Sequence, residues 1–252
     1  MNIIAIIQGR FNSSRLPGKV LKDLGGHPLL VWSVERCRMA KTLTDVVVAT
    51  TEDPADDPIA ALCVEYEYPC FRGSQFDVLD RYYRAAQQFS ADVIVRVTAD
   101  CPLIDPSVVD RVVQDFLRGG ADFVANRLPP PWTRTYPIGL DTEVVAFAGL
   151  ERAWKEAVLK HEREHVMPYF YDQDGRFRVR IVDHDPDYGS QRWTVDTPED
   201  LDLLREIVAR LDGRMDVPWT EVLALLEREP ELARINAAVK HKSGLEHDAR
   251  ME

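Results

Sequence analysis

The sequence contains little of what marks a secreted or membrane-spanning protein. Its four cysteines form no C-x-x-C pair, and scattered thiols fit a reducing compartment better than a disulfide framework. No apolar run approaches the roughly 20 residues that a membrane helix needs. The apolar stretch Asn2–Gln8 has only the length of a strand and lacks a preceding basic flank. We therefore expect a cytoplasmic protein with no membrane insertion.

Positive charge is also in deficit. Lys and Arg number 31 against 42 Asp and Glu, which gives a formal net charge of −11. Such a surface repels phosphates overall, so a nucleic-acid partner is not expected. Hydrophobic residues at 45% and charged residues at 29% are values of a folded globular chain, and 252 residues suffice to bury a large core. Any phosphate chemistry must therefore use a local basic site.

Strand-like and helix-like segments alternate along the chain. This rhythm predicts an α/β fold, a single doubly wound sheet that is mainly parallel (mixed) with helices on both faces. The expected strands are Asn2–Gln8, Asp45–Thr50, Tyr68–Phe71, Asp92–Val97, Ala121–Asn126 and Gln191–Val195. The expected helices are Pro28–Met39, Pro58–Tyr66, Asp77–Phe89, Pro106–Leu117 and Pro198–Leu211, with two short helices in the tail Trp219–Lys242.

The alternation breaks at Leu128–Pro137, which holds four prolines. Strand-like segments return at Asp141–Phe147 and Arg176–Val182, around helical material. We take 127–190 as a small arm that leaves the sheet and serves dimerisation or acceptor binding. The whole chain, 1–252, is predicted to be one domain.

The segment after the first strand is unusually basic, with Arg10, Arg15 and Lys19 close together. Ligands of doubly wound sheets bind at the carboxyl ends of the strands, so these cations predict a polyphosphate site. The alternative is a solvated turn with ordinary surface cations. The segment is not a P-loop, because Ser13 stands at its first glycine position and Val20 follows the lysine. No Gly-x-Gly-x-x-Gly fingerprint occurs either.

Two aspartates each follow an expected strand. Asp100 comes after Asp92–Val97, and Asp196 after Gln191–Val195. If both strands are parallel, both carboxylates emerge beside the basic loop, where carboxylates and phosphates together suit Mg²⁺. The alternative is that each aspartate only opens a turn.

One motif points elsewhere. His161-Glu162-Arg163-Glu164-His165 matches H-E-x-x-H, the helical zinc motif of metalloproteases. Its surroundings are charged, Pro168 follows soon after, and no third ligand is evident. We take the match as accidental and keep a metal hydrolase as a minor alternative.

A family resemblance covers most of the chain. The segment Gln8–Leu30 resembles the signature of the cytidylyltransferases that activate acidic sugars. These are the acylneuraminate and 3-deoxy-manno-octulosonate cytidylyltransferases and, in particular, the SpsF-like branch of spore-coat polysaccharide synthesis. The chain departs from that branch at Gly9, where alanine is usual, and at Asn12, where glycine is usual. Further blocks similar to that branch are Phe71–Ser74, Asp77–Tyr83, Val97–Pro106, Gly139–Glu143, Arg163–Val166, Val195–Leu201 and the tail segment that contains Asn236.

The resemblance implies Mg²⁺-dependent transfer of CMP from CTP to an acidic or phosphorylated sugar-like acceptor, with release of pyrophosphate, in a homodimer. The expected catalytic residues are Arg10, Arg15 and Lys19, and the expected metal ligands are Asp100 and Asp196. The expected nucleotide-binding residues are Gln8, Gly9, Ser14, Arg72, Ser74 and Asp100. The expected acceptor contacts are Asp141, Glu143 and His165. For His165 the alternative is a purely structural role. The alternatives for function are a sugar-1-phosphate nucleotidyltransferase that uses another base and a non-catalytic nucleotide-sugar-binding protein.

Overall fold

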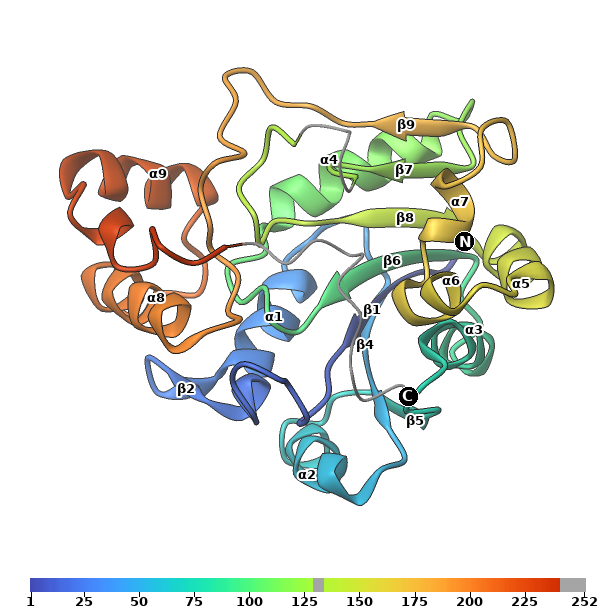
Figure 1. Cartoon of the computed structure of the whole chain (residues 1–252), viewed down its shortest axis with the longest axis horizontal. Coiled ribbons are helices and arrows are strands. Elements are labelled where there is room, and N and C mark those ends of the chain that lie inside the picture. The colour runs from blue at the N-terminus through green and yellow to red at the C-terminus, as the bar shows by residue number, and fades with distance from the viewer. Residues whose placement is uncertain (129–133, 241–252) are drawn as a thin grey trace.

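The computed structural model describes residues 1–128 and 134–240 of the chain. These residues form a seven-stranded sheet in the spatial order β5-β4-β1-β6-β8-β7-β9 (Figure 1). β8 is antiparallel to both of its neighbours, and the other pairings of this sheet are parallel. The predicted α/β class with a mainly parallel sheet is confirmed. The strands are β1 Ile3–Gln8, β4 Asp45–Thr51, β5 Cys70–Gly73, β6 Val93–Thr98, β7 Phe123–Ala125, β8 Glu143–Ala146 and β9 Val179–Ile181.

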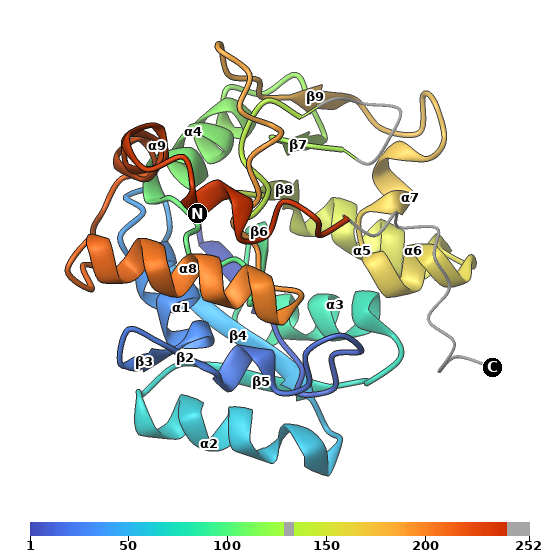
Figure 2. The ribbon, with the colours of Figure 1, turned by 60° about the vertical axis from the view of Figure 1, so that its left-hand side comes forward.

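Helices cover both faces of the sheet (Figure 2). They are α1 Leu29–Arg38, α2 Asp57–Glu65, α3 Val78–Gln88, α4 Pro106–Leu117, α5 Phe147–Glu156, α6 Lys160–His165, α7 Pro168–Tyr171, α8 Pro198–Arg210 and α9 Trp219–Arg228. The smaller elements are the hairpin of β2 Asp23–Leu24 and β3 His27–Pro28, and the 3-10 helices Lys19–Leu21, Pro54–Asp56 and Leu232–Arg234.

The continuous apolar run of β1 is explained by its place in the centre of the sheet. Ile3, Ala5 and Ile7 pack on one face, in a buried cluster with α1, α2 and α4. Ile4 and Ile6 point to the opposite face, in a second cluster with α3, α5 and α7. Because successive side chains of a strand alternate between faces, a strand with helices on both sides needs apolar residues throughout.

The sheet has one edge at which six of its strands end. Since β1, β4, β5, β6, β7 and β9 run in the same direction, their carboxyl ends lie there, and antiparallel β8 begins there. Gln8, the last residue of β1, lies level with Thr98 of β6, and Glu143 of β8 lies level with Arg96 of β6 and Ala125 of β7. We call this the carboxyl edge. It is the side on which doubly wound sheets bind ligands.

The predicted strand Gln191–Val195 is wrong. Its one recorded sheet-like contact in the described chain is an isolated bridge between Ile138 and Arg192. Trp193 and Val195 are fully buried, but in a third cluster with α8 and α9. The alternation of apolar and polar residues therefore reflects an extended segment packed against helices. The same alternation is expected of a sheet strand, so the sequence pattern does not distinguish the two.

The predicted departure of 127–190 from the sheet is also wrong in part. β8 lies inside the sheet between β6 and β7, and β9 pairs with β7 at its edge. The prolines at 129–131 lie outside the described residues. A role of the region in dimerisation or acceptor binding stays a prediction.

Most other elements fall within two residues of their predicted bounds, including α4 at Pro106–Leu117. In the tail, α9 and the 3-10 helix Leu232–Arg234 are separated around Pro230, as predicted. None of the helices in the described residues has the length and apolar character to cross a membrane.

Candidate active site

The basic loop after β1 folds back on itself. The carbonyl of Phe11 accepts hydrogen bonds from Ser13 N (2.9 Å) and Gly18 N (2.8 Å), which closes the loop. Gly18 has a φ of 67°, and a Cβ there would lie 2.9 Å from the Phe11 ring, so this position favours glycine. Phe11 N also donates to Asp56 Oδ1 (2.7 Å), in the segment that follows β4. The closed loop leads directly into Lys19, at the carboxyl edge.

The ammonium group of Lys19 lies between two carboxylates. Its Nζ is 2.7 Å from Asp100 Oδ2 and 2.9 Å from Asp196 Oδ1, and it donates to the carbonyl of Val195 (2.8 Å). Burial alone would lower the pKa of Lys19, but the charges of Asp100 and Asp196 outweigh burial and raise this pKa above its ordinary value. Lys19 therefore stays charged, and a single cation contacts both acids.

Asp196 is in contact with three cations. Besides Lys19, its Oδ2 lies 2.9 Å from Arg15 Nη2 and 2.8 Å from Arg192 Nη2. Burial would raise the pKa of Asp196, but the Lys19 charge and the hydrogen bonds from Lys19 and Arg192 hold it well below its usual range. Asp196 is therefore ionised throughout the neutral range.

Asp100 and Asp196 are brought together by loop contacts. Val195 N donates to the carbonyl of Asp100 (2.8 Å), and Thr194 Oγ1 donates to the same oxygen (3.0 Å). The segment before Asp196 thus runs along residue 100 without being a sheet strand. The structure places the two acids on one edge with Arg15 and Lys19, and what they bind stays a prediction.

A buried network behind Asp196 was not predicted from the sequence. Asp200 is fully buried and accepts two hydrogen bonds from Arg192, at 2.9 Å each. It also accepts the backbone N–H groups of Asp196 (2.9 Å) and Thr197 (3.1 Å). Asn236 Nδ2 donates to Asp200 Oδ1 (2.9 Å) and to the carbonyl of Arg192 (3.1 Å).

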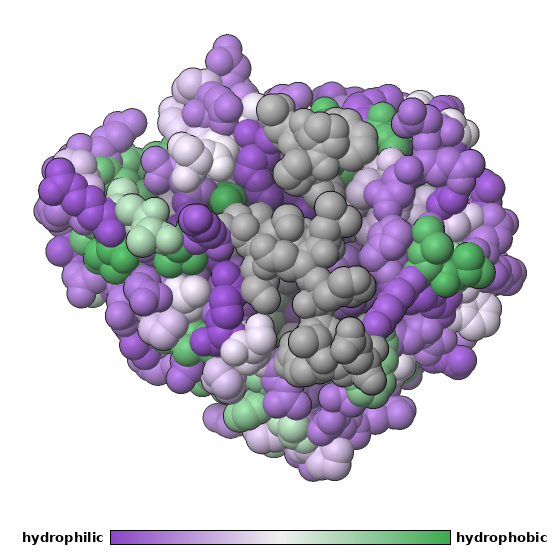
Figure 3. All heavy atoms as spheres, viewed as in Figure 1, coloured by the Kyte–Doolittle hydropathy of each residue, from purple (hydrophilic) through white to green (hydrophobic). Residues whose placement is uncertain are grey.

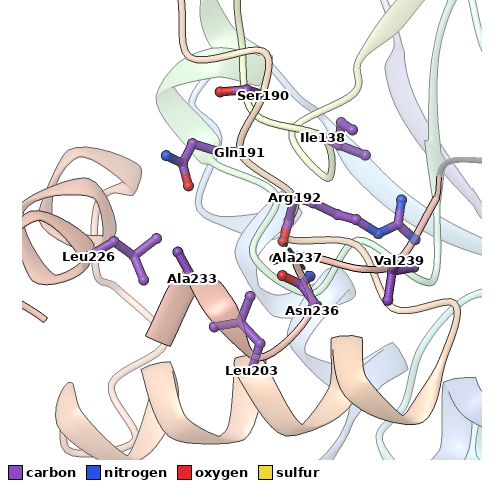
Figure 4. Close-up of a pocket in the computed structure, with 10 residues that line it drawn as sticks. All are labelled: Ile138, Ser190, Gln191, Arg192, Leu203, Leu226, Ala233, Asn236, Ala237 and Val239. Atoms are coloured by element: carbon purple, nitrogen blue, oxygen red, sulfur yellow. Dashed lines mark hydrogen bonds between the residues drawn. The ribbon is translucent and has the colours of Figure 1, made fainter. Parts of the chain in front are cut away.

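Arg192 and Asn236 line a cavity of about 320 Å³ together with apolar side chains that include Leu203 and Leu226. Figure 4 shows Leu203 on α8, below Asn236. The sequence predicts Asp200 only as the capping-box acid of α8, a role that it does fill. Its bonds to Arg192 and Asn236 depend on how distant segments pack, and no local signal announces them.

The other residues of the basic loop are less tightly grouped. Gln8 Oε1 accepts from Arg96 Nε (3.1 Å), and Gly9 is buried where an added Cβ would lie 3.0 Å from Ala99 Cβ. Ser14 is exposed. Arg10 lies toward α3, where burial above all, with the Arg10 charge as a further cause, lowers the pKa of Arg81 to about 10. Arg10 is therefore close enough to α3 for its charge to act on Arg81.

Arg72 and Ser74, at the end of β5, are both held by local contacts. Ser74 Oγ accepts from Asp77 N (3.0 Å), in the turn that opens α3. The nitrogens of Arg72 all have partners, which are the carbonyls of Thr51 (2.8 Å) and Asp53 (3.1 Å) and the carboxylate of Asp57 (2.7 Å). Arg72 thus fastens β5 to the segment after β4, and a direct contact with a base would require one of these bonds to exchange.

The acids expected to contact the acceptor are paired with arginines. Glu143 is buried against Arg96, level with it across the sheet. Asp141 Oδ1 accepts from Arg134 Nη1 (2.8 Å), and its Oδ2 lies 3.2 Å from Arg127 Nε. The sequence did not single out these three arginines.

The H-E-x-x-H segment forms α6, but its side chains are used locally. His161 Nε2 lies 2.8 Å from Asp172 Oδ2. Glu162 is buried and accepts the backbone N–H of Leu159 (3.1 Å) at the start of the helix. His165 is the last residue of α6. Across the described residues, no group of three or more His, Cys, Asp or Glu side chains is arranged to hold a metal, so the motif has no third ligand there.

Comparison with known proteins places these features in a wider context. A family model described as cytidylyltransferase matches residues 4–237. The spore coat polysaccharide biosynthesis protein SpsF of Bacillus subtilis is 31% identical, over 92% of this chain and 97% of that protein. The 3-deoxy-manno-octulosonate cytidylyltransferase of Bdellovibrio bacteriovorus is 34% identical, over 46% of this chain and 47% of its own. The solved structure of a cytidylyltransferase from Leptospira borgpetersenii superimposes with a TM-score of 0.88 at 31% identity, over 96% of this chain and all of that one.

Proposed function

The chain belongs to the cytidylyltransferase family, and from this premise we propose that it transfers CMP from CTP to an acidic or phosphorylated sugar-like acceptor, with Mg²⁺ as the metal. In this reaction an acceptor oxygen forms a bond to the α-phosphorus of CTP. The bond from that phosphorus to the bridging oxygen breaks, pyrophosphate leaves, and the acceptor hydroxyl loses its proton. The product is assigned to surface polysaccharide or glycoconjugate synthesis.

The observation that carries the proposal is the arrangement around Lys19. One ammonium contacts both Asp100 and Asp196, and Arg15 contacts Asp196 from a second side. Two acids and two cations thus meet at the carboxyl edge of a chain with a net charge of −11. Phosphoryl transfer depends on positioning and on charge neutralisation, which such a group supplies.

The donor set fits a divalent cation. Asp100 and Asp196 offer carboxylate oxygens, the ligands that Mg²⁺ prefers, and their side chains are 24% and 19% exposed. The Lys19 ammonium contacts both acids, which shows that they are close enough for one cation to reach both. When bound, the metal would neutralise charge on the α- and β-phosphates and orient them.

The side chains of the chain itself would do the rest. Arg15 and Lys19 would bind the β- and γ-phosphates and absorb the charge that builds on pyrophosphate as it leaves. Arg10, which lies toward α3, would meet the nucleotide from the other side of the loop. Gln8 and Ser74 would contact the edge of the cytosine base. Arg72 would act indirectly, by holding the end of β5 in place.

The test is a two-way panel of nucleotides and acceptors. Pyrophosphate release is measured with CTP, UTP, ATP and GTP, each with a sugar acid, a sugar 1-phosphate and a neutral sugar. We expect release with CTP and an anionic acceptor, and its loss when EDTA removes the metal. Preference for UTP with a sugar 1-phosphate would instead identify a sugar-1-phosphate nucleotidyltransferase that uses another base. If no combination of nucleotide and acceptor released pyrophosphate, the proposal would be contradicted.

A matched pair of variants ties activity to the site. We expect Lys19→Gln to lower kcat/KM at least about a hundredfold, because it removes a charge-assisted contact to the phosphates. Lys41→Gln removes an equal charge from an exposed position outside the loop and is expected to leave kcat/KM unchanged. Equal activity of the two variants would separate Lys19 from the chemistry.

A further inference from the structure

A second charged cluster lies along the same edge of the sheet. Arg96 and Glu143 face each other across β6 and β8, and Gln8 accepts from Arg96 Nε (3.1 Å). Arg127 follows β7, and its Nε lies 3.2 Å from Asp141 Oδ2. The second arginine on Asp141 is Arg134, which approaches with Nη1 at 2.8 Å and Nη2 at 3.3 Å.

Positive charge exceeds negative charge in this cluster. Three arginines share two carboxylates, and all five side chains are at most 22% exposed. Since water screens such partly buried charges poorly, the excess is felt locally even though the whole chain carries −11. A partly buried site with this balance attracts an anion.

Arg127 is the member of the cluster with donors to spare. Its Nε is buried and makes no hydrogen bond, since the geometry toward Asp141 is unsuitable. Within the described chain, neither Nη of Arg127 has a recorded partner, whereas Arg134 uses both Nη atoms and Arg96 uses Nε and Nη1. Of the Arg127 nitrogens, only Nε is both buried and without a hydrogen bond, and the side chain is 22% exposed. A guanidinium whose Nη donors remain open is suited to an oxyanion from outside the chain.

The cluster also lies on the side of the edge where transfer is proposed. Gln8, which accepts from Arg96 Nε (3.1 Å), lies level with Thr98 at the end of β6, and its carbonyl accepts from Ala99 N (2.9 Å). Gln8 therefore connects the arginine cluster to the segment that carries Asp100. An acceptor anchored at Arg127 would lie beside the pair of acids that the transfer uses.

We propose that Arg127, supported by Arg134, binds an oxyanion of the acceptor, either the carboxylate of a sugar acid or the phosphate of a sugar phosphate. The proposal rests on the proposed function, because it assigns the acceptor end of that site. It also changes the role expected for Asp141 and Glu143. They serve as counter-charges of the arginines and do not themselves bind sugar hydroxyls.

The test measures binding without turnover. The full chain is titrated calorimetrically with 3-deoxy-manno-octulosonate, with glucose 1-phosphate and with glucose, alone and in the presence of CDP, which has no pyrophosphate to release. We expect the wild type to bind one of the two anionic sugars and not glucose. Binding of 3-deoxy-manno-octulosonate would identify a carboxylate as the group that Arg127 holds, and binding of glucose 1-phosphate would identify a phosphate. A wild type that binds neither anion more tightly than glucose overturns the proposal.

Two arginine variants locate the site. Arg127→Gln should weaken binding of the preferred anion about ten- to a hundredfold, the range of a lost charge-assisted contact. Arg118→Gln removes an equal charge from a side chain that is 74% exposed and should leave that affinity unchanged. Where Arg127→Gln fails to bind CTP as the wild type does, Arg127→Lys replaces it, since lysine keeps the charge and loses the planar fork. An anion affinity that neither change reduces overturns the proposal.

Asp141→Asn separates the two roles of that residue. If Asp141 only holds arginines, the variant gains positive charge in the cluster and binds the anion at least as tightly as the wild type. If Asp141 binds the sugar directly, the affinity falls, and the counter-charge role is wrong. Because all these readouts are binding constants, an absence of pyrophosphate release with every acceptor would count against the proposed function while leaving the Arg127 result intact.

Discussion

One ammonium group, that of Lys19, occupies the position between Asp100 and Asp196. Without it, the two carboxylates would repel each other across a partly buried gap. A divalent cation would compete for the oxygens that Lys19 now contacts, Asp100 Oδ2 and Asp196 Oδ1. Under the proposed function, Lys19 would then be freed to meet the phosphates, while Arg192 would continue to hold Asp196.

Neutralising either carboxylate should abolish turnover with the fold retained. We expect Asp100→Asn and Asp196→Asn to lower kcat at least about a hundredfold, because each removes a charged ligand of the proposed metal. Pyrophosphate release measures this, and Asp202→Asn, at a side chain that is 62% exposed, is the control. Wild-type kcat in both site variants would end the metal proposal.

Removing the Lys19 charge should raise the affinity for Mg²⁺ even though it lowers activity. In Lys19→Met the two carboxylates lose the cation between them, so we expect the nucleotide-free protein to bind Mg²⁺ more tightly than the wild type. Titration of the apoprotein with Mg²⁺ measures the affinity. Weaker binding in the variant would mean that Lys19 and the metal do not share these ligands.

At the scale of elements, the start of α8 fixes the position of Asp196. Thr197 caps the helix and Pro198 is its first residue, a boundary that the sequence predicts directly. Arg192 precedes this start, and Asn236 comes from the chain after the last 3-10 helix. A contact between residues 36 positions apart cannot be inferred from local patterns, which explains why the capping role was predicted and the network was not.

Breaking this network should cost both stability and positioning. Asp200→Asn removes the fully buried one of the two carboxylates that pair with Arg192, and we expect a loss of about 3–5 kcal/mol in the free energy of unfolding. Asn236→Ala removes two hydrogen bonds of that network and should cost about 1–3 kcal/mol. Urea unfolding measures both.

The kinetic consequence of Asn236→Ala distinguishes positioning from mere support. We expect kcat to fall with KM for CTP unchanged, since the network touches Asp196 and not the nucleotide. The nearby exposed Glu231→Gln serves as the control. A rise in KM for CTP at constant kcat would point to a direct nucleotide contact.

Acid should weaken the same element. Burial alone would raise the pKa of Asp200, but its hydrogen bonds from Arg192 and Asn236 lower it, and the pKa of Asp196 is lowered as well. A carboxyl whose pKa falls on folding adds stability that is complete above its unfolded value of about 3.9 and is lost as pH falls below it. We expect unfolding free energy, measured from pH 7 to pH 3, to drop below about pH 4, and to drop less in Asp200→Asn. If the wild type and Asp200→Asn lost the same stability in acid, the Asp200 carboxylate would not be the origin of the acid sensitivity.

For the whole molecule, alternation and apolar runs were enough to predict the sheet, because burial between two helix layers leaves a strong pattern in β1, β4 and β6. They failed for 191–195, whose buried side chains pack on helices, and for the placement of β8 inside the sheet. Short strands after a proline-rich break carry no signal of which neighbours they pair with. The cationic loop and the two acids were predictable because each lies beside an expected strand end.

The predicted homodimer belongs to this scale. Val158 and Leu159, between α5 and α6, are 85% and 51% exposed, and Figure 3 shows apolar surface in the same part of the molecule. If 127–190 pairs two copies, these side chains are suited to the contact, since large exposed apolar groups favour burial. We expect sedimentation equilibrium to give a dimer and Val158→Asp to shift it toward monomer. A wild-type monomer would contradict the prediction, as would a dimer that Val158→Asp leaves intact.

The most direct measurement is a crystal structure of the protein with CTP and Mg²⁺. We predict the triphosphate at the carboxyl edge, with its oxygens in contact with Arg15 and Lys19 and the metal on Asp100 and Asp196. A nucleotide bound elsewhere, with Lys19 still between the two carboxylates, would contradict this placement.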